Sequence, residues 1–183
     1  MTNGQVSLTK VDAAKRQMTE SIRLFFEGRD EVSVHTLASA SAQVFYDLCK
    51  AQGKPTLLRG QEMIRDEKRK EWLKFVKGSE NFFKHAEKDP DELHVLVPMM
   101  THVTILETVQ ACFDLTGRFT YEGTIFLCWF GIQYPELLLE GPLKRHIETQ
   151  SRAFQIHGSD LGVFRDMILF KERILERMPH VFG

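Results

Sequence analysis

The chain has 183 residues, of which 43% are hydrophobic and 27% charged, and its formal net charge is −1. This length and composition fit one globular domain and exclude widespread disorder. A net charge so close to zero gives no general attraction to nucleic acid or to an anionic membrane. Binding of either would therefore need a local basic patch.

Three cysteines, Cys49, Cys112 and Cys128, stand far apart among apolar neighbours, with no C-x-x-C pair. This pattern favours buried free thiols over disulfides or a zinc site and predicts a cytoplasmic protein. The first ten residues lack the apolar core of a signal peptide, and the most apolar window, 124–132, is too short to span a bilayer. We therefore expect no membrane association.

Residues 1–8 are predicted to form a flexible tail, and 9–183 a single helical domain. Thr9 and Asp12 have the spacing of a capping box at the start of a helix that Gly28 ends.

The second helix is predicted to begin with Ser33 as its cap and to end near Gln52. Its Ala and Ser residues at 38–42 predict close approach of a neighbouring helix. Residues 56–64 are expected to form a connector.

The next segment, 66–87, is predicted to be one long helix with Gly78 as a weak point. At about 100° per residue, its aromatic residues gather on one side and its lysines on the other. We call the second side the basic ridge; it consists of Lys70, Lys74, Lys77, Asn81, Lys84 and Lys88, with His85 at its edge. Lysines bind phosphates as point charges, so the ridge predicts nucleic acid or an acidic protein as a partner. An ordinary solvated helix face is the alternative.

Four further helices are expected. Pro98 suits the start of one that stops at Gly117 and runs through Met99, Val103, Leu106, Val109, Gln110 and Phe113. The stretch 121–132 is apolar nearly all round, which fits a buried helix or a strand. We favour the helix because no partner strand is visible. With helices at about 143–156 and 160–177, the sequence predicts an all-α, single-domain bundle of about seven helices.

Two histidine pairs are candidate sites. His35 and Thr36 begin the second helix, where backbone N–H groups favour an anion; an exposed first-turn histidine is the alternative. Asn81 and His85 lie one helical turn apart on the basic ridge, where His85 is a candidate base, or simply an exposed polar side chain.

Asn81, Lys84 and His85 resemble, in degenerate form, the Arg-Asn-x-x-x-His motif of HEPN-domain proteins. Those proteins are helical bundles, often dimeric, and many are metal-independent ribonucleases that act through an arginine and a histidine. The resemblance covers this helix and the fold class alone, and Glu80 stands where the motif has its arginine. It implies a ribonuclease, or an inactive relative of one, as an alternative function.

Four short phrases resemble a family of uncharacterised bacterial helical proteins, which implies a bacterial, cytoplasmic origin and supplies no activity. They lie at 13–17, 33–38, 81–86 and 135–138.

The sequence predicts no metal or cofactor, because no histidine has a glutamate three residues before it and no Gly-rich phosphate loop is present. Trp129, Phe130, Tyr134 and the leucines 137–139 form a dense apolar block that predicts a homodimer interface, with core packing as the alternative. The prediction is thus a non-catalytic binding module. Its candidate binding residues are Lys74, Lys77, Asn81, Lys84, His85, Lys88, His35 and Thr36.

Overall fold

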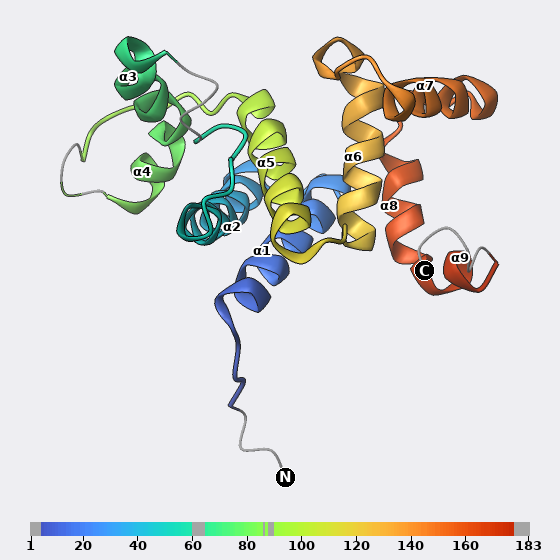
Figure 1. The fold of residues 1–183 in the computed structure, drawn as a ribbon, viewed down its shortest axis with the longest axis horizontal. Helices are drawn as coiled ribbons and strands as arrows, with labels where there is room; N and C mark the ends of the chain where they lie inside the picture. Colours follow the sequence, from blue (N-terminus) through green and yellow to red (C-terminus); the bar gives the residue numbers. More distant parts are fainter. Residues whose placement is uncertain (1–4, 60–64, 86, 88–89, 178–183) are drawn as a thin grey trace.

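Nine α-helices and one short 3₁₀ helix form the regular structure of the described part of the chain, with no strand among them (Figure 1). This computed structural model describes residues 5–59, 65–85, 87 and 90–177. The all-α bundle is confirmed, and two helices are added to the predicted seven because the segments 66–87 and 160–177 are each broken in two. The elements are α1 (Lys10–Phe26), α2 (Glu31–Ala51), α3 (Asp66–Val76), α4 (Gly78–Lys84), α5 (Pro98–Thr116), α6 (Tyr121–Gln133), η1 (Pro135–Leu137), α7 (Pro142–Phe154), α8 (Leu161–Leu169) and α9 (Lys171–Arg177).

The capping box at the start of α1 is confirmed. Thr9 Oγ1 accepts a hydrogen bond from the Asp12 N–H, and Asp12 Oδ2 accepts one from the Thr9 N–H, both at 3.1 Å. Residues 5–8 precede the helix as exposed chain without regular structure, and residues 1–4 of the predicted tail lie outside the described residues.

The start of α2 differs from the prediction. Asp30, not Ser33, caps the helix, and its carboxylate accepts the Ser33 N–H at 2.8 Å. Aspartate caps helices as well as serine does and carries a charge that the helix dipole favours. His35 therefore lies in the second turn of α2 rather than at its first N–H groups.

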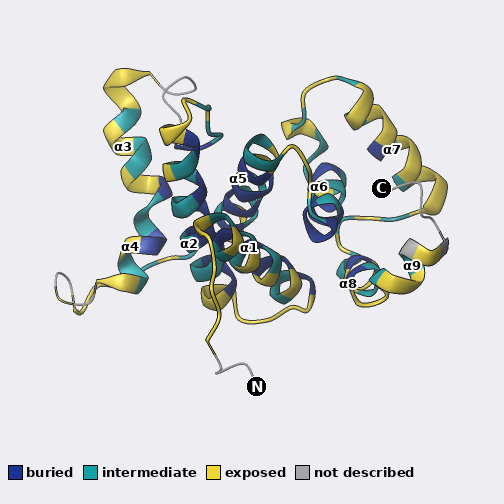
Figure 2. Ribbon diagram, turned by 60° about the horizontal axis from the view of Figure 1, so that its bottom comes forward, coloured by how far each residue is buried: buried dark blue, intermediate teal, exposed yellow. Residues whose placement is uncertain are grey.

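The centre of the bundle is formed by α1, α2 and α5, whose buried faces turn toward one another (Figure 2). The predicted close approach at 38–42 is confirmed: Ala38 and Ala42 are buried, and Ser41 Oγ donates to the Ala14 carbonyl of α1 at 2.9 Å. Small side chains at these positions let the two backbones come together.

The other end of the molecule is built on α6, with α7 and α8 packed against it (Figure 1). The helical interpretation of 121–132 is confirmed. A Cβ atom on Gly131 would lie 2.9 Å from Ile147 Cδ1, so the missing side chain lets α7 approach closely. Among the described residues no helix is long and apolar enough to cross a membrane.

The buried face of α5 carries both apolar and polar residues. Val109 is buried as expected, but Gln110 and Phe113 are exposed. The same helix buries four polar residues. Thr104 and Thr108 donate to carbonyls of α5 itself, whereas Thr101 and Glu107 face α2 and the loop before α3. The buried polar residues are Thr101, Thr104, Glu107 and Thr108.

The segment 66–87 is not one continuous helix. Lys77, with φ −92° and ψ 1°, separates α3 from α4, and the chain leaves the helix at His85, before the predicted end. Glycine at position 78 favours a break there. The break lets α4 turn Ser79 and Glu80 into the protein, where both are buried.

Candidate functional site

A cluster of polar side chains, all buried except the half-buried His94, lies where α2, α4 and α5 meet the loop before α3. We call it the buried polar cluster; it comprises His35, Arg59, Ser79, Glu80, His94, Thr101 and Glu107. Arg59 and Glu107 are each only 2% exposed. Such burial is rare for charged residues unless they are paired.

Two carboxylates surround the buried Arg59 guanidinium. Arg59 Nη2 donates to Glu80 Oε2 at 3.3 Å, and Nε lies 3.9 Å from Glu107 Oε2. Glu107 Oε1 also accepts the backbone N–H groups of Leu58 and Arg59, both at 3.1 Å. Burial raises the pKa of Glu107, and the nearby Arg59 charge and the two N–H groups oppose that rise.

Hydrogen-bonding capacity in this cluster exceeds what the described residues satisfy. Arg59 Nε and Nη1, Glu107 Oε2 and His35 Nε2 are buried without a hydrogen-bond partner among them. Because the dielectric constant is low in the interior, each hydrogen bond or ion pair that the cluster does form contributes more to stability than it would at the surface.

His35 is 1% exposed, so the interpretation of this residue as an exposed first-turn side chain is wrong, and its role as an anion ligand stays a prediction. Its Nδ1 lies 3.0 Å from Thr101 Oγ1, and its ring meets Phe83 edge-on. Burial lowers the pKa of His35 to about 4, so the ring is neutral at pH 7. Thr36 is half-buried beside it.

His94, rather than His85, shares the cluster with His35. Its Nε2 lies 2.7 Å from Ser79 Oγ, and its ring stacks on Phe82 at 5.0 Å between centroids. His85 is exposed at the end of α4, with Nδ1 3.6 Å from Glu87 Oε1. Of the two histidines in the predicted sites, His35 is therefore buried in the protein and His85 is exposed to solvent.

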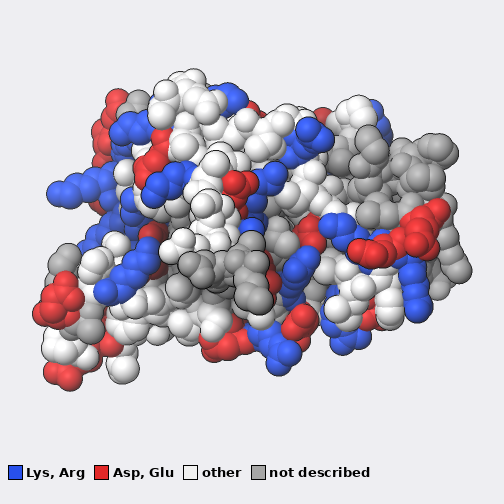
Figure 3. Space-filling model, turned by 90° about the horizontal axis from the view of Figure 1, so that it is seen from below, with Lys and Arg blue, Asp and Glu red and all other residues white. Residues whose placement is uncertain are grey.

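The basic ridge is not one open face. Lys77 is half-buried and donates from Nζ to Gln43 Oε1 at 3.1 Å, and Lys84 is paired with the buried Glu80 at 2.8 Å. Lys70 and Lys74 are exposed and make no ion pair with another described residue. Lys88 lies outside the described residues. Figure 3 shows Lys and Arg side chains at the end of the molecule that holds α3 and α4, with acidic side chains between them.

Helix α3 is attached to the body by a narrow contact. Trp72 Nε1 donates to the Leu58 carbonyl at 2.7 Å, and Val76 is buried. Phe75 is 57% exposed on the same helix as Lys70 and Lys74, with its ring centroid 6.0 Å from that of Trp72. Asn81 is exposed on the next helix.

A second cationic surface runs along α1. A groove of about 480 Å³ there is lined by Lys15, Arg16 and Arg23, with Glu20 between them. Arg23 is already paired with the buried Glu122 at 2.8 Å. With Arg23 paired, the groove keeps two cations, Lys15 and Arg16, and one acid, Glu20. It therefore serves as the comparison surface for the binding of anions by the lysines of α3.

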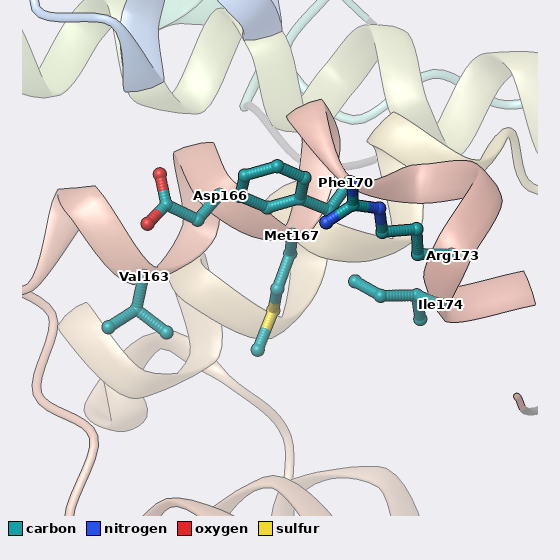
Figure 4. Close-up of a pocket in the computed structure, with 6 residues that line it drawn as sticks. All are labelled: Val163, Asp166, Met167, Phe170, Arg173 and Ile174. Carbon is teal, nitrogen blue, oxygen red and sulfur yellow. The ribbon is translucent and has the colours of Figure 1, made fainter.

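An open groove of about 450 Å³ lies along α8 and α9 (Figure 4). Its lining is mainly apolar, and the Arg173 guanidinium lies over the Phe170 ring, 5.5 Å from the centroid. Such a lining suits apolar contacts better than a polar ligand.

The predicted dimer block lies mostly in the core. Trp129 is 2% exposed and packs on Phe25, with ring centroids 4.6 Å apart. The Tyr134 hydroxyl lies 2.8 Å from His102 Nδ1, and burial lowers the pKa of His102 to about 4. Leu139 alone of these residues is almost fully exposed, at 91%.

The described residues contain no group of three or more His, Cys, Asp or Glu that could hold a metal ion, and the three cysteines are free. No family model, curated protein or solved structure matches this chain. The resemblances to HEPN-domain proteins and to the bacterial helical family therefore stay predictions.

Proposed function

We propose that this protein is a non-catalytic binding module that holds single-stranded nucleic acid against α3. The observation that carries the proposal is the exposure of Lys70 and Lys74, without an ion pair to any described residue, on the same helix as the exposed ring of Phe75. The net charge of −1 makes such a local surface necessary.

The chemistry of these three side chains suits one ligand. Lysines four apart on a helix lie about 6 Å from each other, a spacing at which both can contact one phosphate backbone. The exposed ring of Phe75, about 100° around the same helix from Lys74, offers a stacking surface that accepts any base. Asn81 and His85, exposed on α4, extend the polar surface along the chain.

The test is binding of a labelled single-stranded oligonucleotide, followed by fluorescence anisotropy over a range of salt concentrations. Lys70→Ala with Lys74→Ala is expected to weaken binding at low salt by about tenfold and to reduce the slope of log K against log salt by about 1.4. Phe75→Ala is expected to weaken binding by about 1–3 kcal/mol without changing that slope.

Lys15→Ala with Arg16→Ala is the matched control, because it removes two cations from the groove on α1. Equal effects of the two double variants would show nonspecific attraction and contradict the proposal. Absence of oligonucleotide binding, with an acidic peptide bound instead, would replace nucleic acid by an acidic protein as the partner.

The ribonuclease alternative gains no support from this site. Glu80, at the position of the arginine in the HEPN motif, is buried and paired with Arg59 and Lys84. A labelled single-stranded RNA incubated with the protein in EDTA tests it directly, and the binding proposal expects that RNA to stay intact. Cleavage that disappears in a folded His85→Ala variant would establish a nuclease instead.

A further inference from the structure

Helices α3 and α4 lie together at one end of the molecule, outside its hydrophobic core (Figures 1 and 2). We call residues 66–84, which form these two helices, the arm. Among the described residues, the buried members of the core come from α1, α2, α5, α6 and α8, and none comes from the arm. Within the arm, α4 packs on α2 and α3 packs on α4. Because apolar burial is the main stabilising contribution to folding, the arm depends on other contacts to stay in place.

Polar contacts attach the arm to the rest of the protein. Hydrogen bonds join the two at four places: Trp72 with Leu58, Lys77 with Gln43, Glu80 with Arg59 and Ser79 with His94. The buried polar atoms that lack a described partner gather at the same junction, on His35, Arg59 and Glu107. Local opening takes least free energy where apolar contacts are few and buried polar groups are incompletely paired. The junction between the arm and α2 is therefore where we expect local opening.

His35 of α2 lies beneath the arm. Its ring meets that of Phe83 edge-on, with 5.9 Å between centroids, and its contact on α5 is the uncharged Thr101. The charged or titratable groups that face it are Glu80 of α4, Arg59 of the loop before α3 and His94 of the segment before α5. Burial lowers the pKa of His35 to about 4; Glu80 opposes this change, whereas His94 and Arg59 add to it. The closed arm thus disfavours a charged ring.

We propose that the arm opens as one unit from α2, uncovering His35, and that a fall in pH drives this opening. In the open form the His35 ring faces water and takes up a proton. The charged ring then has to lose that proton before Phe83 covers it again. Glu107 keeps its hydrogen bonds to the Leu58 and Arg59 N–H groups in both forms, so its titration does not drive the change.

The size of the effect follows from proton linkage. Between pH 6.5 and pH 4 the open form binds a proton that the closed form does not, so a fall in pH favours opening. With a pKa of 6.5 in the open form and about 4 in the closed form, the opening equilibrium constant is expected to rise about 20-fold from pH 7 to pH 5.

Native-state hydrogen exchange followed by mass spectrometry measures this opening peptide by peptide. At pH 7 the amides of α4 are expected to exchange before those of α1 and α5, because the arm opens without global unfolding. After correction for the intrinsic exchange rate at each pH, the opening constant of α4 is expected to be about 20-fold larger at pH 5. No oligonucleotide is present, so the result does not depend on the binding of nucleic acid by α3.

Two histidine variants separate opening of the arm from general acid destabilisation. His35→Gln leaves an uncharged polar side chain that takes up no proton, so the opening constant of α4 is expected to lose its dependence on pH. His102→Gln is the matched control. Burial lowers the pKa of His102 to about 4 as well, but this ring contacts Tyr134 and Trp129 rather than the arm. The 20-fold rise for α4 is therefore expected to remain in His102→Gln.

Exchange of the α4 amides only together with those of α1, at both pH values, would overturn the proposal, because the arm would then open only when the whole protein unfolds. Wild-type protein alone decides this point, even if His35→Gln does not fold. An equal rise at pH 5 in wild type and in folded His35→Gln would also overturn it, since His35 would not be the group that takes up the proton. Loss of the rise in His102→Gln would assign it to global stability instead.

Discussion

Replacing Glu107 by alanine is expected to lower the free energy of unfolding by about 3–5 kcal/mol. The substitution leaves the buried Arg59 guanidinium with Glu80 as its remaining counter-charge. It also removes the acceptor of the Leu58 and Arg59 backbone N–H groups. Buried charges that lose their partner cost more than the pair contributes, because the remaining ion stays out of water. Urea denaturation followed by circular dichroism measures the change.

Glu107→Gln is the matched variant, since its amide oxygen still accepts the two N–H groups but carries no charge. It is expected to lose about half as much stability as Glu107→Ala. Glu27→Ala, at an exposed carboxylate paired with Arg29 at 3.0 Å, is the surface control and is expected to change stability by less than about 1 kcal/mol. A loss below about 1 kcal/mol for Glu107→Ala would mean that Arg59 is hydrated in solution and would contradict the buried ion pair.

Acidification from pH 7 to pH 5 is expected to destabilise the protein by roughly 4 kcal/mol through the buried His35 and the half-buried His102. Burial lowers the pKa of both His35 and His102 from 6.5 to about 4. Between these values the unfolded chain binds protons that the folded protein does not, so falling pH favours unfolding. Each ring contributes roughly 2 kcal/mol over this interval, and stability returns when the pH is raised above 6.5.

The pH dependence separates this effect from the general cost of a core substitution. Urea denaturation at pH 7 and pH 5 is expected to show that His35→Gln and His102→Gln each reduce the pH-dependent loss by about 2 kcal/mol. His146→Gln, at an exposed position of α7, is the control and is expected to leave the loss unchanged. Equal losses in wild type and both variants would contradict neutral buried rings.

Much of the fold follows from local sequence signals. Thr9 and Asp12 fix the start of α1, Pro98 the start of α5 and Gly117, with φ 73°, the end of α5. These signals act within one turn of helix, so the sequence alone is sufficient to predict them. Gly78 is a local signal for the break at Lys77, but the burial of Glu80 beside Arg59, 21 positions earlier, has no such signal.

The candidate site was only partly predictable for the same reason. Lysines four apart on a helix predict Lys70 and Lys74 as neighbours, but which lysines stay exposed depends on Gln43 and Glu80. Arg59 lies in a predicted connector, and Glu107 lies off the apolar stripe of its helix, so neither carries a signal of burial. One available hint is the polar character of α5, whose threonines and Glu107 share a side.

The backbone of Leu58 forms one hydrogen bond to helix α3 at the surface and another to Glu107 in the interior. The Leu58 N–H is bound by Glu107 in the core, and its carbonyl accepts the indole N–H of Trp72 on α3. One connection between α3 and the buried Glu107 carboxylate therefore runs through the backbone of Leu58. The exposed helix α3 is thus connected to the buried ion pair of Arg59 and Glu107.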